Sequence, residues 1–181
     1  MLYCSRHQRL EVCMNRSRLQ TWTLTGIFAA LIAIATLLVQ IPLPATGGYA
    51  NAGDGVILTC AFILAPLPAA LAAGVGSALA DLILGYVVYA PATLLIKGGM
   101  ALTAAILFRR MAKAPSHARY LIPAIPAEGI MVLGYLVYEA FVLGLHSAAL
   151  GSVMGNVGQG IVGILIACAI TPLLKRIKAF M

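Results

Sequence analysis

Long apolar segments broken by very few charges are the feature that most limits what this chain can fold into. Residues 77–100, SALADLILGYVVYAPATLLIKGGM, are typical: one helix ends, the chain turns from Gly85 to Pro91, and another helix starts. Only Asp81 and Lys97 are charged in this segment. Charged residues make up 9% of the whole chain, against about 25% in soluble domains. The sequence therefore predicts a polytopic membrane protein.

The apolar segments predict an all-α fold, an integral membrane six-helix bundle. At roughly 20 apolar residues per span, the chain is long enough for about six spans. We expect them at residues 22–41, 54–65, 68–84, 91–111, 119–143 and 152–174. The second span is short, and an external loop precedes it. We expect residues 1–20 to be a loosely ordered, basic cytoplasmic tail, and residues 21–181 to be a six-helix substrate-binding domain.

Three clusters of basic residues set the expected orientation. They precede the first span, separate the fourth from the fifth and follow the last: Arg6, Arg9, Arg16 and Arg18; Arg109, Arg110, Lys113 and Arg119; Lys175, Arg176 and Lys178. With six spans all three lie on one side, and positive residues stay cytoplasmic. We therefore expect both termini to be cytoplasmic, in a multi-pass protein of the bacterial plasma membrane. This distribution fits contact with anionic lipid headgroups and gives no reason to expect nucleic acid as a partner.

Polar side chains are expected at one depth of the bundle. From a helical rise of about 1.5 Å per residue, the outer half holds Asp54, Asp81, Lys97, Glu139, Asn156 and Gln159, with Tyr49, Tyr86, Tyr89, Tyr135 and Tyr138 at the same level. The inner half carries almost none apart from Glu128. An ion path would need polar groups at every depth, whereas a binding cup needs them at one level between apolar walls. The asymmetry predicts a site for a small polar heteroaromatic molecule, open to the outside.

Structural roles are the alternative for each charged residue. Lys97 and Glu139 could form a salt bridge between the fourth and fifth spans. Asp81 could bond the loop that follows it, and Asp54 stands where an N-cap is favoured. We expect both to hold loops. Glu128 could bond a helix interrupted by a proline.

The uncharged polar residues have structural alternatives too. Tyrosines near the outer surface could form an aromatic belt. Asn156 and Gln159, three residues apart on one helix face, could bond neighbouring helices.

Small residues recur at helical spacing in the first span: Gly26, Ala29, Ala30 and Ala33. Such a strip lets another helix approach closely. That helix could belong to this chain or to a partner subunit.

No pattern for metal, cofactor or catalytic chemistry stands out. Cys4, His7 and Cys13 do not have the spacing of a zinc site. Ser77 and His146 could be imagined as an intramembrane protease dyad, but Ser77 lies in Gly-Val-Gly-Ser-Ala rather than Gly-x-Ser-Gly. The phosphate loop G-x-x-x-x-G-K-[ST] is absent, so ATP hydrolysis would need another subunit. We expect neither an enzyme nor a bound cofactor.

Five segments together resemble one transporter family. They are residues 48–54 (GYANAGD), 77–86 (SALADLILGY), 89–98 (YAPATLLIKG), 134–139 (GYLVYE) and 155–159 (GNVGQ). In order and spacing they are similar to the S components, the substrate-binding subunits of energy-coupling factor (ECF) transporters for vitamins. The likeness covers about residues 22 to 178 and favours members for riboflavin, hydroxymethylpyrimidine or pyridoxine-like ligands. Met154 stands where that family leads us to expect proline.

The resemblance implies a six-helix bundle with a ligand site in the outer halves of the later helices and the first external loop. The residues expected to bind substrate are Tyr49, Asn51, Tyr89, Lys97, Tyr135, Glu139, Asn156 and Gln159. It also implies docking of Ala29 and Ala33 on a transmembrane coupling subunit, with two ATPases supplying energy. The alternative is a stand-alone permease or structural membrane subunit, and uptake without any ATPase would favour the permease.

Overall fold

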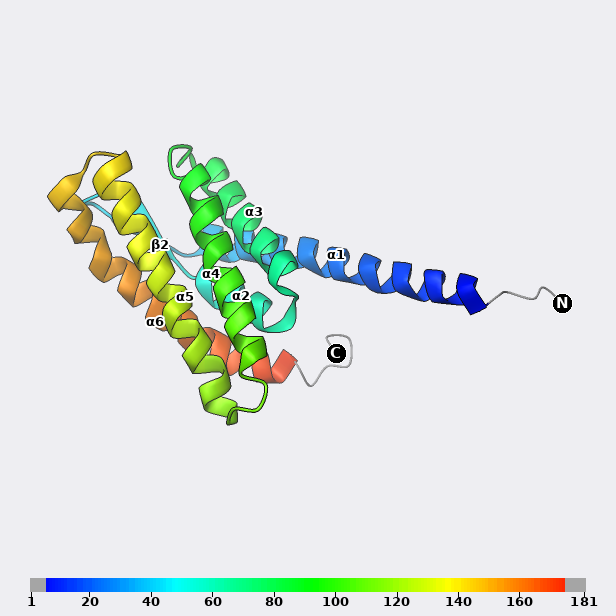
Figure 1. The fold of residues 1–181 in the computed structure, drawn as a ribbon. Coiled ribbons are helices and arrows are strands. Elements are labelled where there is room, and N and C mark those ends of the chain that lie inside the picture. Colours follow the sequence, from blue (N-terminus) through cyan, green and yellow to red (C-terminus); the bar gives the residue numbers. More distant parts are fainter. Residues whose placement is uncertain (1–5, 175–181) are drawn as a thin grey trace.

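The computed structural model describes residues 6–174, with the side chains of residues 6–17, 116 and 117 excepted. Its elements are α1 (Arg6–Leu38), β1 (Gln40–Leu43), β2 (Gly48–Asn51), α2 (Gly53–Ile63), α3 (Pro66–Leu84), α4 (Ala90–Arg110), α5 (Ser116–Val137) and α6 (Leu150–Leu174). A π-helical turn, η1 (Tyr138–Val142), and a 3-10 turn, η2 (His146–Ala149), join α5 to α6. Figure 1 shows α3 beside α4, and α5 beside α6, with the N-terminal part of α1 extending beyond the other helices.

The six predicted helices are all present, but not all can cross a membrane. Within residues 6–174, five helices are long and apolar enough to span a bilayer. The exception is α2, whose 11 residues make a helix about 16 Å long, roughly half the thickness of the hydrocarbon core. Within the described residues, the six predicted helices are therefore five long ones and, at the expected short second span, a half-length one.

The polar N-terminal segment also differs from the expected tail. Residues 6–20 continue α1 as helix rather than forming a loosely ordered segment. Residues 1–5 lie outside the described part of the chain, as do the side chains of His7 and Cys13, so the spacing argument about metal ligands is not addressed there.

The first loop is a small β-hairpin, which the all-α prediction missed. Strands β1 and β2 pair antiparallel, with Ile41 opposite Ala50 and Leu43 opposite Gly48. Gly47 has a φ of 69°, a conformation that glycine adopts without steric cost, and its N–H donates to the Leu43 carbonyl. The hairpin stands between the end of α1 and the start of α2.

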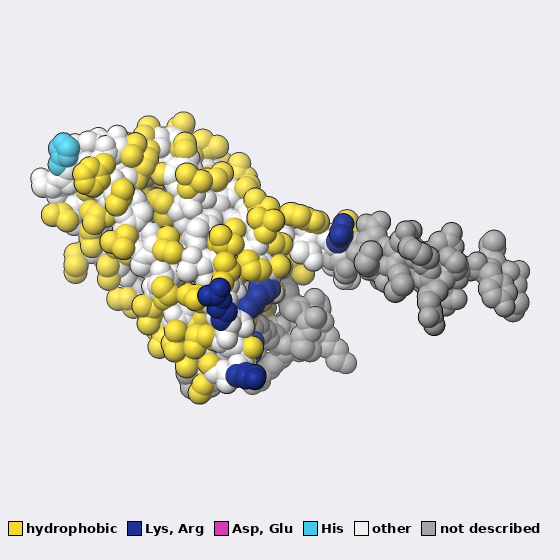
Figure 2. All heavy atoms as spheres, viewed as in Figure 1, with side chains coloured by type: hydrophobic (Ala, Val, Ile, Leu, Met, Phe, Trp, Pro, Cys, Tyr) yellow, Lys and Arg dark blue, Asp and Glu magenta, His cyan; other side chains and the backbone are white. Residues whose placement is uncertain are grey.

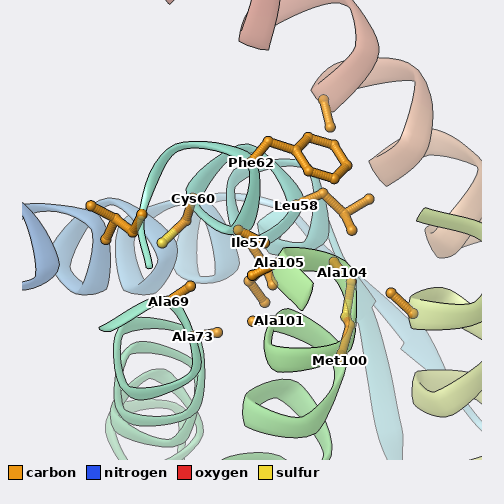
Figure 3. Close-up of a cluster of buried hydrophobic side chains, with 14 of the residues drawn as sticks. Ile57, Leu58, Cys60, Phe62, Ala69, Ala73, Met100, Ala101, Ala104 and Ala105 are labelled. Carbon is orange, nitrogen blue, oxygen red and sulfur yellow. The ribbon is translucent and has the colours of Figure 1, made fainter. Parts of the chain in front are cut away.

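Helix α2 lies at the centre of the bundle. Nine of its 11 residues are buried, and it is packed against α1, α3, α4 and α6. Ile57, Leu58 and Phe62 meet Ala101 and Ala104 of α4 in a dry apolar cluster (Figure 3). The carbonyl of Leu64, just past the end of the helix, accepts a hydrogen bond from Arg109 Nη2 at 3.0 Å. A half-length helix is tolerated at this depth because protein surrounds it.

Small residues in α3 allow two helices to approach it closely. A side chain at Gly74 would collide with the Leu94 carbonyl of α4, its Cβ falling 2.6 Å from that oxygen. A side chain at Gly76 would collide with the backbone of Ala29 in α1.

The outer surface of the bundle is apolar and its basic residues gather at one end (Figure 2). We call this the basic end; it holds the α2–α3 and α4–α5 turns, with Arg109, Arg110 and Lys113 exposed. The opposite end carries the hairpin and the α3–α4 and α5–α6 turns, and we call it the hairpin end. All four acidic side chains that the structure describes, those of Asp54, Asp81, Glu128 and Glu139, are buried.

Candidate functional site

A cavity with about 440 Å³ of empty space, part of it open to solvent, lies at the hairpin end. The hairpin, α1 and the hairpin-end parts of α3, α4, α5 and α6 all contribute to its walls. Its lining residues are Thr36, Leu43, Gly48, Tyr49, Asn51, Ser77, Asp81, Tyr89, Thr93, Lys97, Tyr135, Glu139, Asn156 and Gln159. All eight residues predicted to bind substrate are among them. The structure thus brings those eight together at one site, and their role as ligand contacts stays a prediction.

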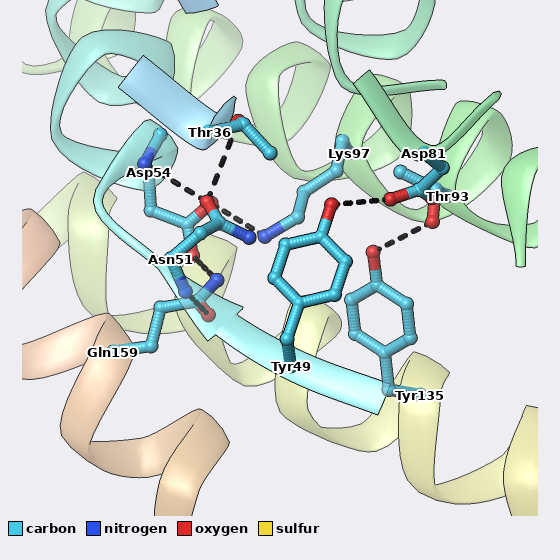
Figure 4. Close-up of polar contacts among 10 residues, drawn as sticks. Thr36, Tyr49, Asn51, Asp54, Asp81, Thr93, Lys97, Tyr135 and Gln159 are labelled. Atoms are coloured by element: carbon cyan, nitrogen blue, oxygen red, sulfur yellow. Dashed lines mark hydrogen bonds and ion pairs between the residues drawn. The ribbon is translucent and has the colours of Figure 1, made fainter. Parts of the chain in front are cut away.

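Lys97 is held by an ion pair across the bundle. Its Nζ lies 2.5 Å from Asp54 Oδ1, with the side chains 2% and 0% exposed. Gln159 Nε2 donates to the other oxygen of Asp54 at 2.5 Å (Figure 4). The predicted alternative of a Lys97–Glu139 pair is therefore wrong, because α2 supplies the counter-charge. Asp54 is not an N-cap either, since Ala52 holds that position and makes no side-chain cap bond.

The same network ties the hairpin to α6. The backbone N–H of Asn51 donates to Gln159 Oε1 at 2.7 Å. Asn51 Oδ1 accepts from the Gly53 N–H at 2.9 Å, so this side chain caps the start of α2. Gln159 thus uses both ends of its amide, one on Asp54 and one on the hairpin, and fixes the position of the ion pair relative to β2.

A second contact joins the hairpin to α3. The Tyr49 hydroxyl donates to Asp81 Oδ1 at 2.5 Å. Burial, together with this bond to a carboxylate, raises the pKa of Tyr49 well above its usual value, so the phenol keeps its proton at neutral pH. Asp81 was predicted to bond the loop that follows it. It does hold a loop, but that loop is the hairpin, which precedes it in the chain. Beside this pair, the Thr93 and Tyr135 hydroxyls are hydrogen-bonded at 2.9 Å.

Glu139 reaches the cavity from η1. The wider π-turn, in which the Leu143 N–H bonds the Tyr138 carbonyl, changes the direction of side chains at the end of α5, and such turns are frequent at functional sites. Glu139 accepts a hydrogen bond from the Ser152 hydroxyl. Its Oε1 lies 3.3 Å from the Tyr89 hydroxyl. Burial and the Glu139 carboxylate raise the pKa of Tyr89 to about 12.

Aromatic rings form a continuous wall at this end. Tyr49 and Tyr86 have ring centroids 4.7 Å apart, Tyr86 and Tyr89 6.3 Å, and Tyr89 and Tyr138 5.8 Å. Tyr138 donates its hydroxyl to the Val88 carbonyl outside the cavity. The ring of Tyr135 lies 5.5 Å from Lys97 Nζ, within cation–π range. Three of the five predicted tyrosines line the cavity, and the other two support them.

Asn156 and Glu128 differ from the residues above because both lack protein partners. Asn156 is buried and lines the cavity, and its side-chain amide bonds no other described residue. Neither oxygen of Glu128 has a hydrogen-bond partner among the described residues. A Cβ at Gly163 would fall 3.0 Å from Glu128 Oε1, so the carboxyl lies against α6. The expectation that Glu128 bonds its own interrupted helix is wrong.

The cavity is rich in acceptors. Lys97 is the one ammonium in its wall, and it already pairs with Asp54. Asp81 and Glu139 are two further buried carboxyls in the wall. Of the described ionisable groups around the cavity, three carboxyls therefore face one ammonium. A ligand that donates hydrogen bonds fits this set better than an anion.

Comparison with known proteins places this chain in a family. Residues 16–178 match the family model described as "ECF-type riboflavin transporter, S component". The chain belongs to this family. A protein of Pyrococcus woesei, named "Uncharacterized protein in gap 3'region", is 37% identical over 146 residues, which cover 80% of this chain and 95% of that one. The "Thiamine precursor transporter HmpT" of Lactococcus lactis subsp. cremoris (strain MG1363) is 27% identical over 164 residues, covering 90% and 92%.

The chain is thus the vitamin- or precursor-binding S component of an ECF transporter, a multi-pass protein of the plasma membrane. Its role is transport, and the resemblance noted from the sequence is confirmed. The protease alternative finds no support in the site, because the hydroxyl of Ser77 has no hydrogen-bond partner among the described residues and His146 is exposed in η2.

Sequence reasoning missed several lining residues of the S component. Ser77 and Asp81 are four apart on α3, and Thr93 and Lys97 are four apart on α4. Residues at this spacing share a helix face. The positions of Asp81 and Lys97 therefore already indicated that the hydroxyl residue one turn earlier lies in the cavity wall. Thr36 had no such signal, because its place in the wall depends on how α1 meets the hairpin.

The predicted docking alanines lie at an edge of α1. Ala29 and Ala33 are half-buried, with the backbone of Ala29 against Gly76 of α3. Gly26 and Ala30 are exposed, and space around Gly26 is open. The strip thus serves an internal contact on one side and is accessible on the other.

Proposed function

We propose that this S component captures a small heteroaromatic vitamin or precursor, of the hydroxymethylpyrimidine, pyridoxine or riboflavin class, in the cavity at the hairpin end. The observation that carries the proposal is the convergence of eight predicted polar and aromatic residues on that one cavity. Tyrosine rings stack on a flat heterocycle. Buried carboxyl, amide and hydroxyl groups bond its edge.

The charged groups in the cavity wall limit which members of this class fit. The charges favour a neutral or cationic ligand without a phosphate or carboxylate group, because Asp81 and Glu139 would repel an anion.

The hairpin end faces outside in this proposal, and both termini are cytoplasmic. Support comes from Arg109, Arg110 and Lys113, which are exposed at the basic end, since positive residues stay on the cytoplasmic side. Substrate would then enter the cavity from outside the cell. The hairpin covers the cavity through Tyr49 and Asn51, so its release would open the site.

Energy comes from partner subunits in this proposal, which are a transmembrane coupling subunit and two ATPases. Docking uses Ala29 and Ala33 on the accessible side of α1. Leucine at both positions is expected to spare ligand binding and stop transport. The backbone of Ala29 also lies against Gly76 of α3, so Ala33→Leu alone is tested beside the double variant. Unchanged transport by Ala33→Leu, with full complex assembly, would contradict the docking role.

Native mass spectrometry of the purified protein tests the proposed function. We expect one small heteroaromatic molecule per chain, lost when Asn156 is replaced by leucine. The matched control is Val157→Leu, next in α6 and outside the cavity wall, which keeps the ligand. Uptake into proteoliposomes should require the coupling subunit, ATPases and ATP. Uptake by this chain alone would make it a stand-alone permease.

A further inference from the structure

Two polar atoms in the cavity wall have no partner. Asp81 Oδ2 and Ser77 Oγ are buried and form no hydrogen bond within the described residues. Both residues are 3% exposed, and both line the cavity. Asp81 Oδ1 accepts from Tyr49, and the Thr93 side chain lies beside the same carboxylate. The neighbouring Thr93 hydroxyl is bonded to Tyr135 (Figure 4).

Buried polar groups in proteins are nearly always hydrogen-bonded, so unpartnered ones call for an explanation. The two atoms come from residues one helical turn apart on α3 and therefore lie on one face. Glu128 also has unpartnered oxygens, but it is not part of the cavity wall. Among the described residues, Ser77 and Asp81 place fully buried side-chain atoms without a partner in that wall, beside the unbonded amide of Asn156.

The chemistry of the two atoms specifies which edge of a heterocyclic ligand would be complementary to them. A carboxylate oxygen accepts hydrogen bonds, and a hydroxyl both donates and accepts. An exocyclic amino group can donate to Asp81 Oδ2, while an adjacent ring nitrogen accepts from Ser77 Oγ. An oxo group in place of the amino group would present only lone pairs to the carboxylate, and this hydrogen bond would be lost.

We propose that Ser77 and Asp81 form a subsite that binds the amino edge of the ligand, an exocyclic amino group beside a ring nitrogen, as in a 4-aminopyrimidine. This subsite rests on the proposed function and narrows its ligand class. It selects aminopyrimidines over pyridoxine, whose ring hydroxyl has no ring nitrogen beside it, and over the flavin ring, whose N–H donor is flanked by carbonyl oxygens rather than by an acceptor nitrogen.

The test uses purified full-length protein and isothermal titration calorimetry. The probes are 4-amino-5-hydroxymethyl-2-methylpyrimidine, its analogue with oxygen in place of the amino group, pyridoxine and riboflavin. Wild-type protein should bind the amino compound at least tenfold more tightly than the oxygen analogue. Binding of none of the four would overturn the proposed function itself. Tighter binding of pyridoxine or riboflavin would leave that function standing and overturn the subsite.

Asp81→Asn is the decisive variant, because its remaining oxygen can still accept from Tyr49 while its amide replaces Oδ2. We expect at least tenfold weaker binding of the amino compound, with the oxygen analogue unchanged or improved. Ser77→Ala should weaken the amino compound about threefold to tenfold. Ser147→Ala, in the exposed turn η2, is the matched control and should bind like wild type.

A purely structural Asp81 would give a different result. Asp81→Asn would then bind the amino compound as wild type does, or would lose affinity for the two pyrimidines equally. Either outcome overturns the subsite. Thermal unfolding of each variant in detergent identifies any loss that comes from misfolding, and Ser77→Ala, which only removes an unbonded oxygen, provides the readout if Asp81→Asn fails to fold.

Discussion

The two ends of the bundle both hold buried side chains but differ in the chemistry of those side chains. Helix α2 begins with Asp54 in the polar network and ends with Phe62 in the apolar core. Helix α4 repeats the pattern, with Lys97 near its start and Phe108 near its end. At the basic end the rings of Phe62 and Phe108 are 4.9 Å apart.

In α2 and α4, the half of the helix at the hairpin end thus carries the polar groups of the candidate site, and the half at the basic end packs in the apolar core. The apolar half needs no specific partners, so many side chains could fill it. The polar half depends on each group finding a particular partner, because an unpaired buried group is costly. Substitutions in the polar half should therefore act by removing a specific partner, and substitutions in the apolar half by removing buried apolar volume.

The largest expected effect is at the ion pair. Lys97→Met leaves the Asp54 carboxylate buried with only Gln159 as partner, and breaking such a pair costs about 3–5 kcal/mol. Unfolding in detergent measures this loss. Adding Asp54→Asn to Lys97→Met should restore part of the stability, since the unpaired charge is gone. Strict additivity of the two substitutions would show that the pair is not coupled.

A substitution in the apolar half should separate stability from binding. Phe62→Ala removes a buried ring and is expected to cost about 3 kcal/mol. Ligand affinity of the folded protein should change by less than about twofold, because distant sites act independently. Calorimetry at a temperature where the variant is folded checks this. A tenfold loss of affinity would mean that the two halves are not separate.

A smaller effect is expected where the hairpin meets α3. Tyr49→Phe removes the donor to Asp81 and should cost about 1.5–3 kcal/mol, the range for hydrogen bonds to charged groups. Hydrogen exchange over residues 40–51 should accelerate. Tyr86→Phe is the matched control, since Tyr86 packs its ring on Tyr49 and its hydroxyl bonds no described residue. Equal exchange in the two variants would exclude the Tyr49 hydroxyl as the anchor.

The smallest effect concerns alkaline pH. The pKa of Tyr89 is raised to about 12, above about 10 in an unfolded chain. The folded state therefore holds this proton more tightly, so the contribution to stability is complete below pH 10 and is lost as pH rises towards 12. Unfolding measured from pH 8 to above 11 should show this loss, and Tyr89→Phe should reduce it. An identical pH profile in the variant would assign the loss to other groups.

The polar level of the bundle could be predicted from the sequence because helix geometry converts residue number into depth. Asn156, Lys97 and Glu139 come from three helices, and each was placed near the hairpin end from its distance to a helix end. The partners could not be predicted in this way. The depth of a residue does not say how its helix is rotated about its own axis. The sequence therefore suggested Glu139 as the ion-pair partner of Lys97, whereas the partner in the structure is Asp54 of α2.

The hairpin and the ends of the helices were harder to predict from the sequence. Strand pairing over residues 40–51 depends on contacts with Gln159 and Asp81, which no local pattern contains. The π-turn at Glu139 has no sequence signal of its own. The shortness of α2 was visible from the prolines that follow it, but its burial depends on the packing of α1, α3, α4 and α6 around it.

A structure of the protein with bound 4-amino-5-hydroxymethyl-2-methylpyrimidine tests the central claim most directly, namely that the polar hairpin end is the ligand site. We predict the ring within the cavity, in contact with a tyrosine face, with Asn156 or Glu139 bonded to its substituents and Lys97 still paired with Asp54. A ligand seated at the basic end near Phe62 and Phe108, with the cavity residues unmoved and unbonded to it, would contradict the account.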